Sequence, residues 1–115
     1  MSRLFQTPFG DVYPHYVAKT IRKGQSVEDL DDIITWLTGF SKAELDQHIA
    51  NQTTFEEFFK QAKLNENAEL ITGTICGVKI QEIEDPLMKK IRYLDKVVDE
   101  IAAGRPLEKV KRKQS

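Results

Sequence analysis

Residues 26–59 read SVEDLDDIITWLTGFSKAELDQHIANQTTFEEFF, and this stretch decides the fold class of the protein. In three places a serine or threonine stands three residues before an acidic residue, which is the pattern of a capping box at a helix N-terminus. The three pairs are Ser26 and Asp29, Ser41 and Glu44, and Thr54 and Glu57. After each pair, apolar residues recur at helical spacing. We therefore predict three consecutive helices and a mainly α protein.

Two further helices are predicted, one on each side of this stretch. Pro14 suits the first position of a helix that Gly24 closes. Asp85 and Pro86 form a second start signal, for a helix that runs to about Ala103. We thus predict about five helices in all.

The two ends of the chain are predicted to be less regular. Residues 1–13 contain the helix breakers Pro8 and Gly10, which favour an irregular N-terminal segment. Residues 105–115 are predicted to form a basic, frayed tail. The chain has no internal repeat, low-complexity run or Ser/Gly linker. We therefore expect residues 1–115 to form a single compact domain.

Residues 70–83 depart from the helical pattern. Gly73 and Gly77 flank β-branched residues, and apolar side chains then alternate with others. This period of two favours a minor extended or β element near residues 72–81, although some of its apolar residues also fit a helix. A strand needs a partner, and the N-terminal segment is the other extended candidate. We therefore predict a two-stranded element that joins these two segments.

The last predicted helix carries apolar residues that step by four, three, four and three positions. They are Leu87, Ile91, Leu94, Val98 and Ile101. This seam spans about two heptads, whereas a coiled coil needs at least three or four. We therefore expect the seam to pack against the rest of the chain. The alternative is an interface with a second copy or with an unknown protein partner.

Charge is segregated along the chain, although the net charge is only −1. Residues 1–23, 24–85 and 86–115 carry net charges of +3, −9 and +5. We expect the basic ends to fold back over the acidic middle and neutralise it. The alternative is a basic surface that binds nucleic acid weakly, although the near-zero net charge argues against a general nucleic-acid or membrane binder. Its members would be Arg3, Lys19, Arg22, Arg105, Lys109, Lys111 and Arg112.

Several classes of protein are excluded by composition and by missing motifs. A single cysteine excludes a disulfide framework and a Cys-rich zinc site. Apolar runs of two or three residues exclude a membrane span, so we expect a soluble cytoplasmic protein without a membrane partner. The chain has no Gly-rich phosphate loop, HExxH motif or Ser-His-Asp signature. We therefore predict no catalytic residue, no cofactor and no metal site.

Four residues are candidates for a small-ligand or catalytic pocket: Tyr13, His15, Tyr16 and Cys76. A histidine among aromatic rings can carry a proton, and a cysteine with a depressed pKa can act as a nucleophile. The neighbours of Cys76 are apolar residues and glycine, which is typical of a small core residue. We therefore predict a buried, unreactive thiol and keep the pocket as the alternative.

Several stretches of consecutive residues resemble one protein family. They are residues 7–19 (TPFGDVYPHYVAK), 34–40 (ITWLTGF), 71–80 (ITGTICGVKI), 83–88 (IEDPLM) and 91–96 (IRYLDK). In these stretches the chain is similar to the bacterial family known as domain of unknown function 2200, over most of residues 3–112. The resemblance implies a stand-alone prokaryotic cytoplasmic protein, and it transfers no activity and no catalytic residue.

These observations favour a small cytoplasmic interaction or regulatory module without catalytic activity. One alternative is a small-molecule-binding protein or enzyme that uses the candidate pocket of Tyr13, His15, Tyr16 and Cys76. A second alternative is a weak nucleic-acid binder that uses the basic termini.

Overall fold

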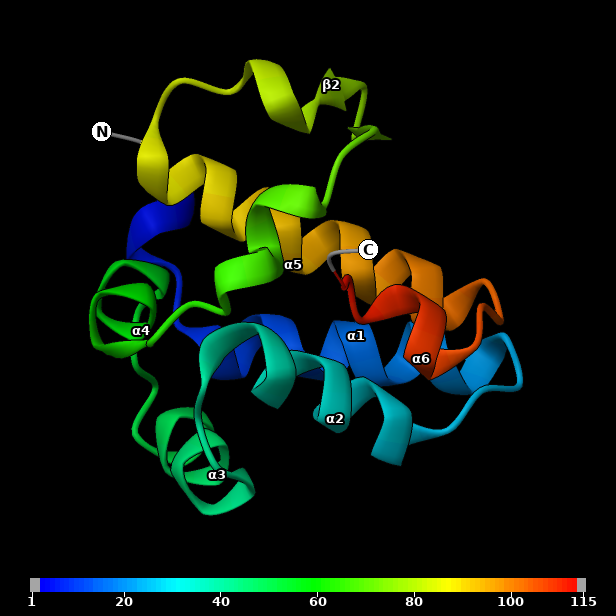
Figure 1. The fold of residues 1–115 in the computed structure, drawn as a ribbon. Helices are drawn as coiled ribbons and strands as arrows, with labels where there is room; N and C mark the ends of the chain where they lie inside the picture. The colour runs from blue at the N-terminus through cyan, green and yellow to red at the C-terminus, as the bar shows by residue number, and fades with distance from the viewer. Residues whose placement is uncertain (1–2, 114–115) are drawn as a thin grey trace.

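A computed structural model describes residues 3–113 as a mainly helical globule with one small β-hairpin (Figure 1). The α-helices are α1 (Phe9–Arg22), α2 (Val27–Thr38), α3 (Lys42–Ala50), α4 (Phe55–Gln61), α5 (Pro86–Ala102) and α6 (Leu107–Val110). Three short 3₁₀ helices and two strands complete the order: η1 (Arg3–Gln6), η2 (Glu66–Leu70), β1 (Thr74–Ile75), β2 (Val78–Lys79) and η3 (Ile80–Glu82). The predicted fold class is confirmed.

The three helices predicted from residues 26–59 begin at the hydroxyl residues that the pattern indicated. Ser41 and Glu44 form a complete capping box, in which each side chain accepts a hydrogen bond from the other residue's backbone N–H. Thr54 accepts from the Glu57 N–H at 3.2 Å. Ser26 caps α2 more simply, because its hydroxyl accepts from the N–H of Glu28 rather than from that of the third residue. All three caps satisfy backbone donors that a helix start leaves free.

Helix α1 begins at Phe9, five residues before the predicted start at Pro14. The expectation that residues 1–13 are irregular is therefore wrong: η1 and the first turns of α1 lie there. Pro14 sits inside the helix, where it has no N–H to donate to the carbonyl four residues earlier. Gly10 is needed for packing, since a Cβ at this position would lie 2.6 Å from the Ile49 carbonyl oxygen of α3. A glycine that resembles a breaker thus allows two helices to approach closely.

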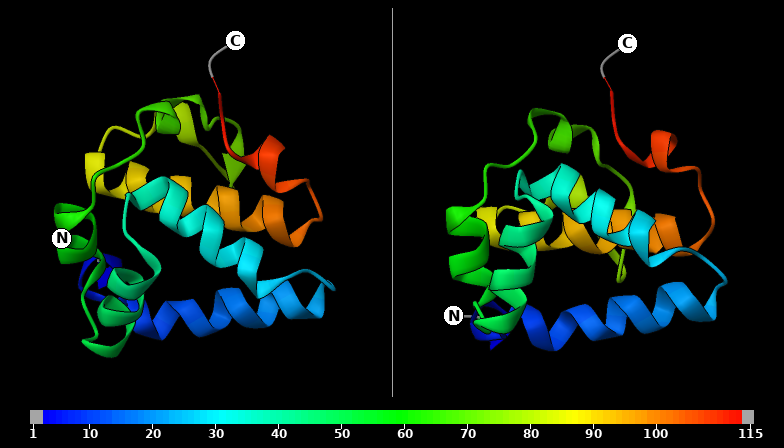
Figure 2. Two further views of the ribbon diagram at one scale, coloured as in Figure 1. Left: turned by 60° about the horizontal axis from the view of Figure 1, so that its bottom comes forward. Right: turned by 90° about the horizontal axis from the view of Figure 1, so that it is seen from below.

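The long helices α1, α2 and α5 run side by side, and each packs against the other two (Figure 2). Their facing sides form the core with the aromatic residues of α4. The rings of Phe9 and Phe58 stack with centroids 4.2 Å apart. Helix α3 packs on α1, and α6 packs on α5 and α2. The core therefore buries the apolar residues that recur at helical spacing in the sequence.

The seam of α5 lies within this core. Ile91, Leu94, Val98 and Ile101 are buried, and Leu87 is half-buried against them. The rest of the chain thus covers the seam, as expected. Self-association through these residues would need them to leave the core, and it stays a prediction.

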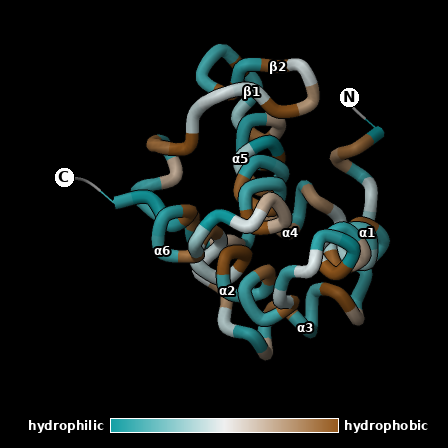
Figure 3. The backbone as a smooth tube through the Cα atoms, turned by 90° about the vertical axis from the view of Figure 1, so that its right-hand side faces the viewer, coloured by the Kyte–Doolittle hydropathy of each residue, from teal (hydrophilic) through white to brown (hydrophobic). Residues whose placement is uncertain are grey.

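The extended element is a hairpin at the end of the molecule opposite α3 (Figure 3). Strands β1 and β2 pair antiparallel, with Thr74 opposite Lys79 and Ile75 opposite Val78. The predicted pairing with the N-terminal segment is wrong, because a two-residue turn lets neighbouring segments pair at a low cost of loop closure. Pro8 of the N-terminal segment instead forms an isolated bridge with Thr54.

The C-terminal segment differs from the predicted frayed tail. Residues 107–110 form α6, and Val110 is fully buried. The Lys111 N–H continues the turn with a hydrogen bond to the Leu107 carbonyl at 3.0 Å. Leu107 and Val110 pack this charged segment against the core, because burial of their side chains removes apolar surface from water. Residues 114 and 115 of the predicted tail lie outside the described part of the chain.

Candidate functional site

The four candidate pocket residues face different parts of the fold. The Tyr13 hydroxyl donates a hydrogen bond to Asp31 of α2, whereas the Tyr16 hydroxyl donates to Asp95 of α5 at 2.8 Å. His15 is exposed on α1. Burial, Asp95 and, to a smaller extent, Cys76 raise the pKa of Tyr16 well above its ordinary value. The structure therefore bonds Tyr13 and Tyr16 to two different helices, α2 and α5, and the four residues do not form one pocket lining.

Cys76 is exposed, so the prediction of a buried thiol is wrong. Cys76 and Gly77 are the two central residues of the hairpin turn, with φ angles of 54° and 77°. A two-residue turn that matches strand twist needs positive φ at both positions. The alternation of apolar residues that suggested a core strand is interrupted at this turn, which turns the thiol outward.

The seven bases of the candidate basic surface do not form one free patch. Four of them are held by carboxylates of the described chain: Lys19 by Asp99 at 2.6 Å, Lys111 by Asp32 at 2.9 Å, and Arg105 and Arg112 by Glu100 at 2.9 and 2.7 Å. Within residues 3–113, Arg3, Arg22 and Lys109 make no ion pair. Arg3 precedes α1 and Arg22 ends it, and a helix of 14 residues is about 20 Å long.

These ion pairs also correct the predicted neutralisation of the acidic middle. Within the described residues, one pair, Lys111 with Asp32, joins a terminal base to residues 24–85. The other paired terminal bases contact Asp95, Asp99 and Glu100, which belong to the C-terminal block itself. The expectation is therefore wrong for these paired bases, because acids on α5 bind them instead of the acids of the middle block.

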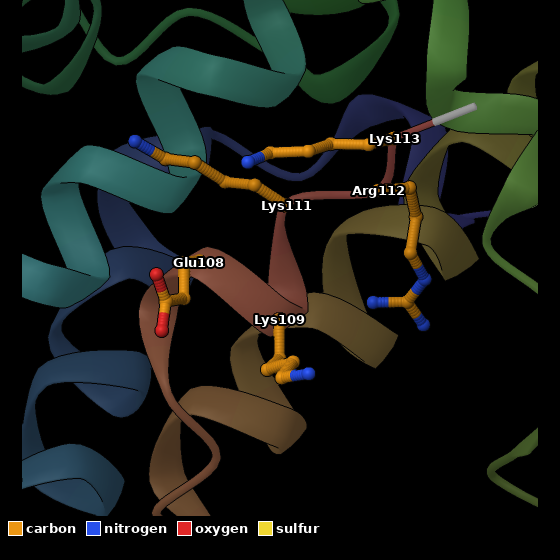
Figure 4. Close-up of a pocket in the computed structure, with 5 residues that line it drawn as sticks. All are labelled: Glu108, Lys109, Lys111, Arg112 and Lys113. Carbon is orange, nitrogen blue, oxygen red and sulfur yellow. The ribbon is translucent and has the colours of Figure 1, made fainter. Parts of the chain in front are cut away.

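Three hollows on the surface differ in whether their charged groups already have partners. The first, of about 470 Å³, is lined by Glu108, Lys109, Lys111, Arg112 and Lys113. Figure 4 shows that Lys111 and Lys113 extend in a similar direction, toward α2, whereas Lys109 and Arg112 point elsewhere. Asp32 and Glu100 thus already bind two of the four cations of this C-terminal hollow, Lys111 and Arg112.

The second hollow, of about 320 Å³, lies between α2 and α3, and Asp31, Asp32, Phe40 and Lys42 are among its lining residues. The Asp31 carboxylate accepts a hydrogen bond from the Tyr13 hydroxyl and lies 3.6 Å from the Lys42 ammonium. Lys42 also contacts Asp46 at 2.6 Å. Much of the charge of this α2–α3 hollow is therefore neutralised from within.

The third hollow, of about 280 Å³, separates η2 from the first half of α5, and we call it the η2–α5 hollow. Lys89, Lys90 and Tyr93 line one wall, because positions three and four apart share one face of an α-helix. Glu66 and Glu69 line the other wall, because positions three apart are eclipsed in a 3₁₀ helix.

Two side chains hold the walls of this hollow in place. Asp85 caps α5 by accepting a hydrogen bond from the Met88 N–H at 2.9 Å. Asn65 caps η2 by accepting from the Asn67 N–H at 2.8 Å, and its amide donates to the Trp36 carbonyl at 3.3 Å. The hollow is thus formed between two capped elements.

The hydroxyl of Tyr93 is the most informative group in the η2–α5 hollow. Tyr93 is only 4% exposed, yet its hydroxyl makes no hydrogen bond within residues 3–113. Every fully buried side-chain oxygen or nitrogen of these residues has a partner, so this hydroxyl keeps some exposure to solvent, and Tyr93 is one of the residues that line the hollow. Burial and then the Glu69 carboxylate raise its pKa above the ordinary value. The phenol is therefore a protonated, unused hydrogen-bond donor at neutral pH.

The charged residues of the η2–α5 hollow are also without partners. Lys89 and Lys90 are half-buried, and within the described residues their side chains make no hydrogen bond or ion pair. The same is true of Glu66 and Glu69, which are exposed. In this respect the hollow differs from the other two, in each of which some of the charged lining residues are paired.

Sequence reasoning missed all of these residues. The residues on α5 could have been identified from the sequence, since Lys89, Lys90 and Tyr93 have helical spacing beside the apolar seam. The residues of the opposite wall could not, because residues 64–69 resemble a loop and carry no signal of their neighbour.

Two further findings concern membrane and metal sites. Within residues 3–113, no helix has the length and apolar character that crossing a membrane requires. The same residues contain no cluster of three or more His, Cys, Asp or Glu side chains that is able to hold a metal ion.

Comparison with known proteins places the chain in a family without an assigned function. No curated protein matches it. A solved crystal structure of uncharacterized protein SP1917 is similar, with 38% sequence identity, a TM-score of 0.90, and coverage of 99% of this chain and 98% of that chain. The family model described as "Uncharacterized protein conserved in bacteria (DUF2200)" matches residues 3–112. The resemblance found in the sequence is confirmed, and the chain belongs to this bacterial family of uncharacterized proteins.

Proposed function

We propose that this protein is a regulatory module that recognises a small polar molecule in the η2–α5 hollow without transforming it. The observation that carries the proposal is the Tyr93 hydroxyl, which has no partner in the described chain although Tyr93 is buried and lines the hollow. Buried tyrosines usually find a hydrogen-bond partner. A polar atom of a ligand would supply the missing one.

The lining of the hollow supports recognition rather than turnover. It offers two ammonium groups, two carboxylates and a phenol. Cys76 and His15, the nucleophile and the base considered from the sequence, are not among its lining residues. Tyr13 and Tyr16, the other members of that candidate pocket, already donate to carboxylates. The enzyme alternative therefore has less support than binding.

Three expectations from the sequence analysis remain predictions alongside this proposal. They are the cytoplasmic location, a protein partner and the absence of nucleic-acid binding. The last has indirect support, because carboxylates already hold four of the seven candidate bases.

The test is a titration of the full chain, followed by amide signals in two-dimensional NMR spectra. Three probes of different charge are used, succinate, putrescine and γ-aminobutyrate, each up to about 10 mM, which detects even millimolar affinity. At least one probe is expected to shift the signals of Lys89, Lys90 and Tyr93 in a saturable way. Tyr93→Phe should weaken that binding about tenfold, the effect of one hydrogen bond.

The matched control is Tyr13→Phe, which also removes a tyrosine hydroxyl, but one that is already bonded to Asp31. It should leave the binding of the probe unchanged. If all three probes leave the signals around Tyr93 unmoved, or if the shifts centre on another hollow, the proposal is wrong.

A further inference from the structure

The two walls of the η2–α5 hollow carry charges of opposite sign that do not meet. Lys89 and Lys90 lie on α5, and Glu66 and Glu69 lie on η2. All four line the same hollow, yet within the described residues no ammonium nitrogen of this wall lies within 4.0 Å of a carboxylate oxygen. Elsewhere in this chain, facing charges close into pairs, as Lys19 and Asp99 do at 2.6 Å. The space between the walls keeps the four groups available.

We propose that the ligand of this hollow is a small zwitterion, which places a carboxylate against Lys89 and Lys90 and an ammonium group against Glu66 and Glu69. The inference rests on the proposed function, since it names the ligand class of the same site. Tyr93 shares a face of α5 with the two lysines, and its hydroxyl would donate a hydrogen bond to the carboxylate. Each charged wall would then contact a group of the opposite sign.

Ligands with a single sign of charge fit less well. A simple anion satisfies the lysines but is repelled by the two glutamates, and a simple cation has the reverse problem. Like-charge contacts of this kind are a common source of specificity in binding sites. A zwitterion gains on both walls, because each of its ends faces the opposite charge.

The size of the hollow limits the ligand further. Sites for drug-sized ligands have volumes of about 300–1,000 Å³. The η2–α5 hollow, at about 280 Å³, lies just below this range. A compact amino acid is therefore a better match than a nucleotide or a folded peptide.

The experiment uses a series of amino acids in which the two charges move apart: glycine, β-alanine, γ-aminobutyrate and δ-aminovalerate. Each is titrated into the full chain together with two derivatives, the N-acetyl form, which lacks the positive charge, and the amide form, which lacks the negative charge. Binding is followed by the NMR signals around Tyr93. One member of the series is expected to bind at least about tenfold more tightly than both of its derivatives.

Double variants identify which wall binds each charged group of the ligand. Glu66→Gln with Glu69→Gln should lower the affinity for the best member to that of its N-acetyl form. Lys89→Met with Lys90→Met should lower it to that of its amide form. Lys42→Met, in the α2–α3 hollow, is the control and should have no effect.

The outcomes separate this inference from the proposed function. If an N-acetyl form, an amide form, succinate or putrescine binds around Tyr93 as tightly as the best amino acid, the hollow is a binding site but the zwitterion is wrong. If no compound of any charge moves the Tyr93 signals, both proposals fail. The comparison of derivatives uses the unmodified protein, so it decides the question even where a variant folds poorly.

Discussion

The two halves of α5 use charge in opposite ways. In the C-terminal half, Asp95 accepts from Tyr16, Asp99 pairs with Lys19, and Glu100 pairs with Arg105 and Arg112. In the N-terminal half, Arg92 pairs with Asp95, whereas the side chains of Lys89, Lys90 and Tyr93 have no polar partner within residues 3–113. One helix thus carries a fully bonded set of polar groups and an unbonded one.

The difference separates residues that stabilise the fold from residues that are free to bind a ligand. The acids of the C-terminal half connect α5 to α1, at separations of 79 and 80 residues along the chain, and to the segment around α6 that follows α5. Glu100 is only 4% exposed, so its charge depends on the two arginines. The lysines of the N-terminal half connect nothing. Substitutions in the two halves should therefore have different effects on stability.

The largest effect is expected for Glu100→Gln. The substitution removes a buried negative charge and leaves Arg112, whose side chain is 16% exposed, without its ion pair. Breaking a buried pair by removing one partner costs about 3–5 kcal/mol of unfolding free energy. We expect a loss near the lower end, about 3 kcal/mol, because the glutamine oxygen still accepts a hydrogen bond. Urea unfolding followed by circular dichroism measures it.

Asp99→Asn is the control for this prediction, on the neighbouring position of the same helix. The Lys19–Asp99 pair has side chains that are 35% and 44% exposed. Exposed pairs contribute at most about 1 kcal/mol. Equal losses for the two variants would show that burial does not distinguish them and would contradict this account of Glu100.

Tyr16→Phe should have the next largest effect. Tyr16 is buried, and its hydroxyl donates to the Asp95 carboxylate, which also receives the Arg92 guanidinium at 2.8 Å. A hydrogen bond to a charged group contributes about 1.5–3 kcal/mol, so we expect a loss of about 2 kcal/mol. Thermal and urea unfolding of the two proteins measure this difference. A variant as stable as the wild type would mean that Arg92 alone satisfies Asp95.

Alkaline pH should reduce the difference between these two proteins. The folded-state pKa of Tyr16 is raised by burial and by Asp95. Above pH about 10 the unfolded chain therefore loses this proton while the folded chain keeps it, and stability falls by up to about 1.4 kcal/mol per pH unit. Tyr16→Phe lacks this contribution. Its stability deficit should shrink as the pH rises from about 9 to about 11, whereas a constant deficit would exclude the raised pKa.

The smallest effect is expected for Tyr93→Phe in the N-terminal half. Its hydroxyl has no hydrogen bond in the described chain, so its removal breaks none. The unfolding free energy should stay within about 0.5 kcal/mol of the wild-type value. Chemical unfolding beside Tyr16→Phe provides the comparison. A loss as large as that of Tyr16→Phe would show that the two halves of α5 do not differ in this way.

Local signals predicted most of the helices. Helix caps act over a short distance. Ser41, Glu44 and Asp85 lie within three residues of the backbone N–H groups that they cap, and Pro86 stands at a helix start, where a missing N–H costs little. The effect of these residues therefore depends little on distant segments. Where a distant segment intervened, local reasoning was wrong. Gly10 resembles a helix breaker until Ile49 is placed against it, and the tail looks frayed until Val110 is buried. The extended element near residues 72–81 was placed correctly, but its partner strand and the orientation of Cys76 were not.

The sequence by itself determined the mainly α fold class, the starts of α2, α3, α4 and α5, and membership of the family. These depend on hydrogen bonds and apolar spacing within one or two turns, and on runs of consecutive residues. Only the tertiary structure decided which charges are paired and which polar groups line the η2–α5 hollow. Glu69 and Tyr93 are far apart along the chain, and whether such groups meet depends on how the helices pack rather than on any local pattern.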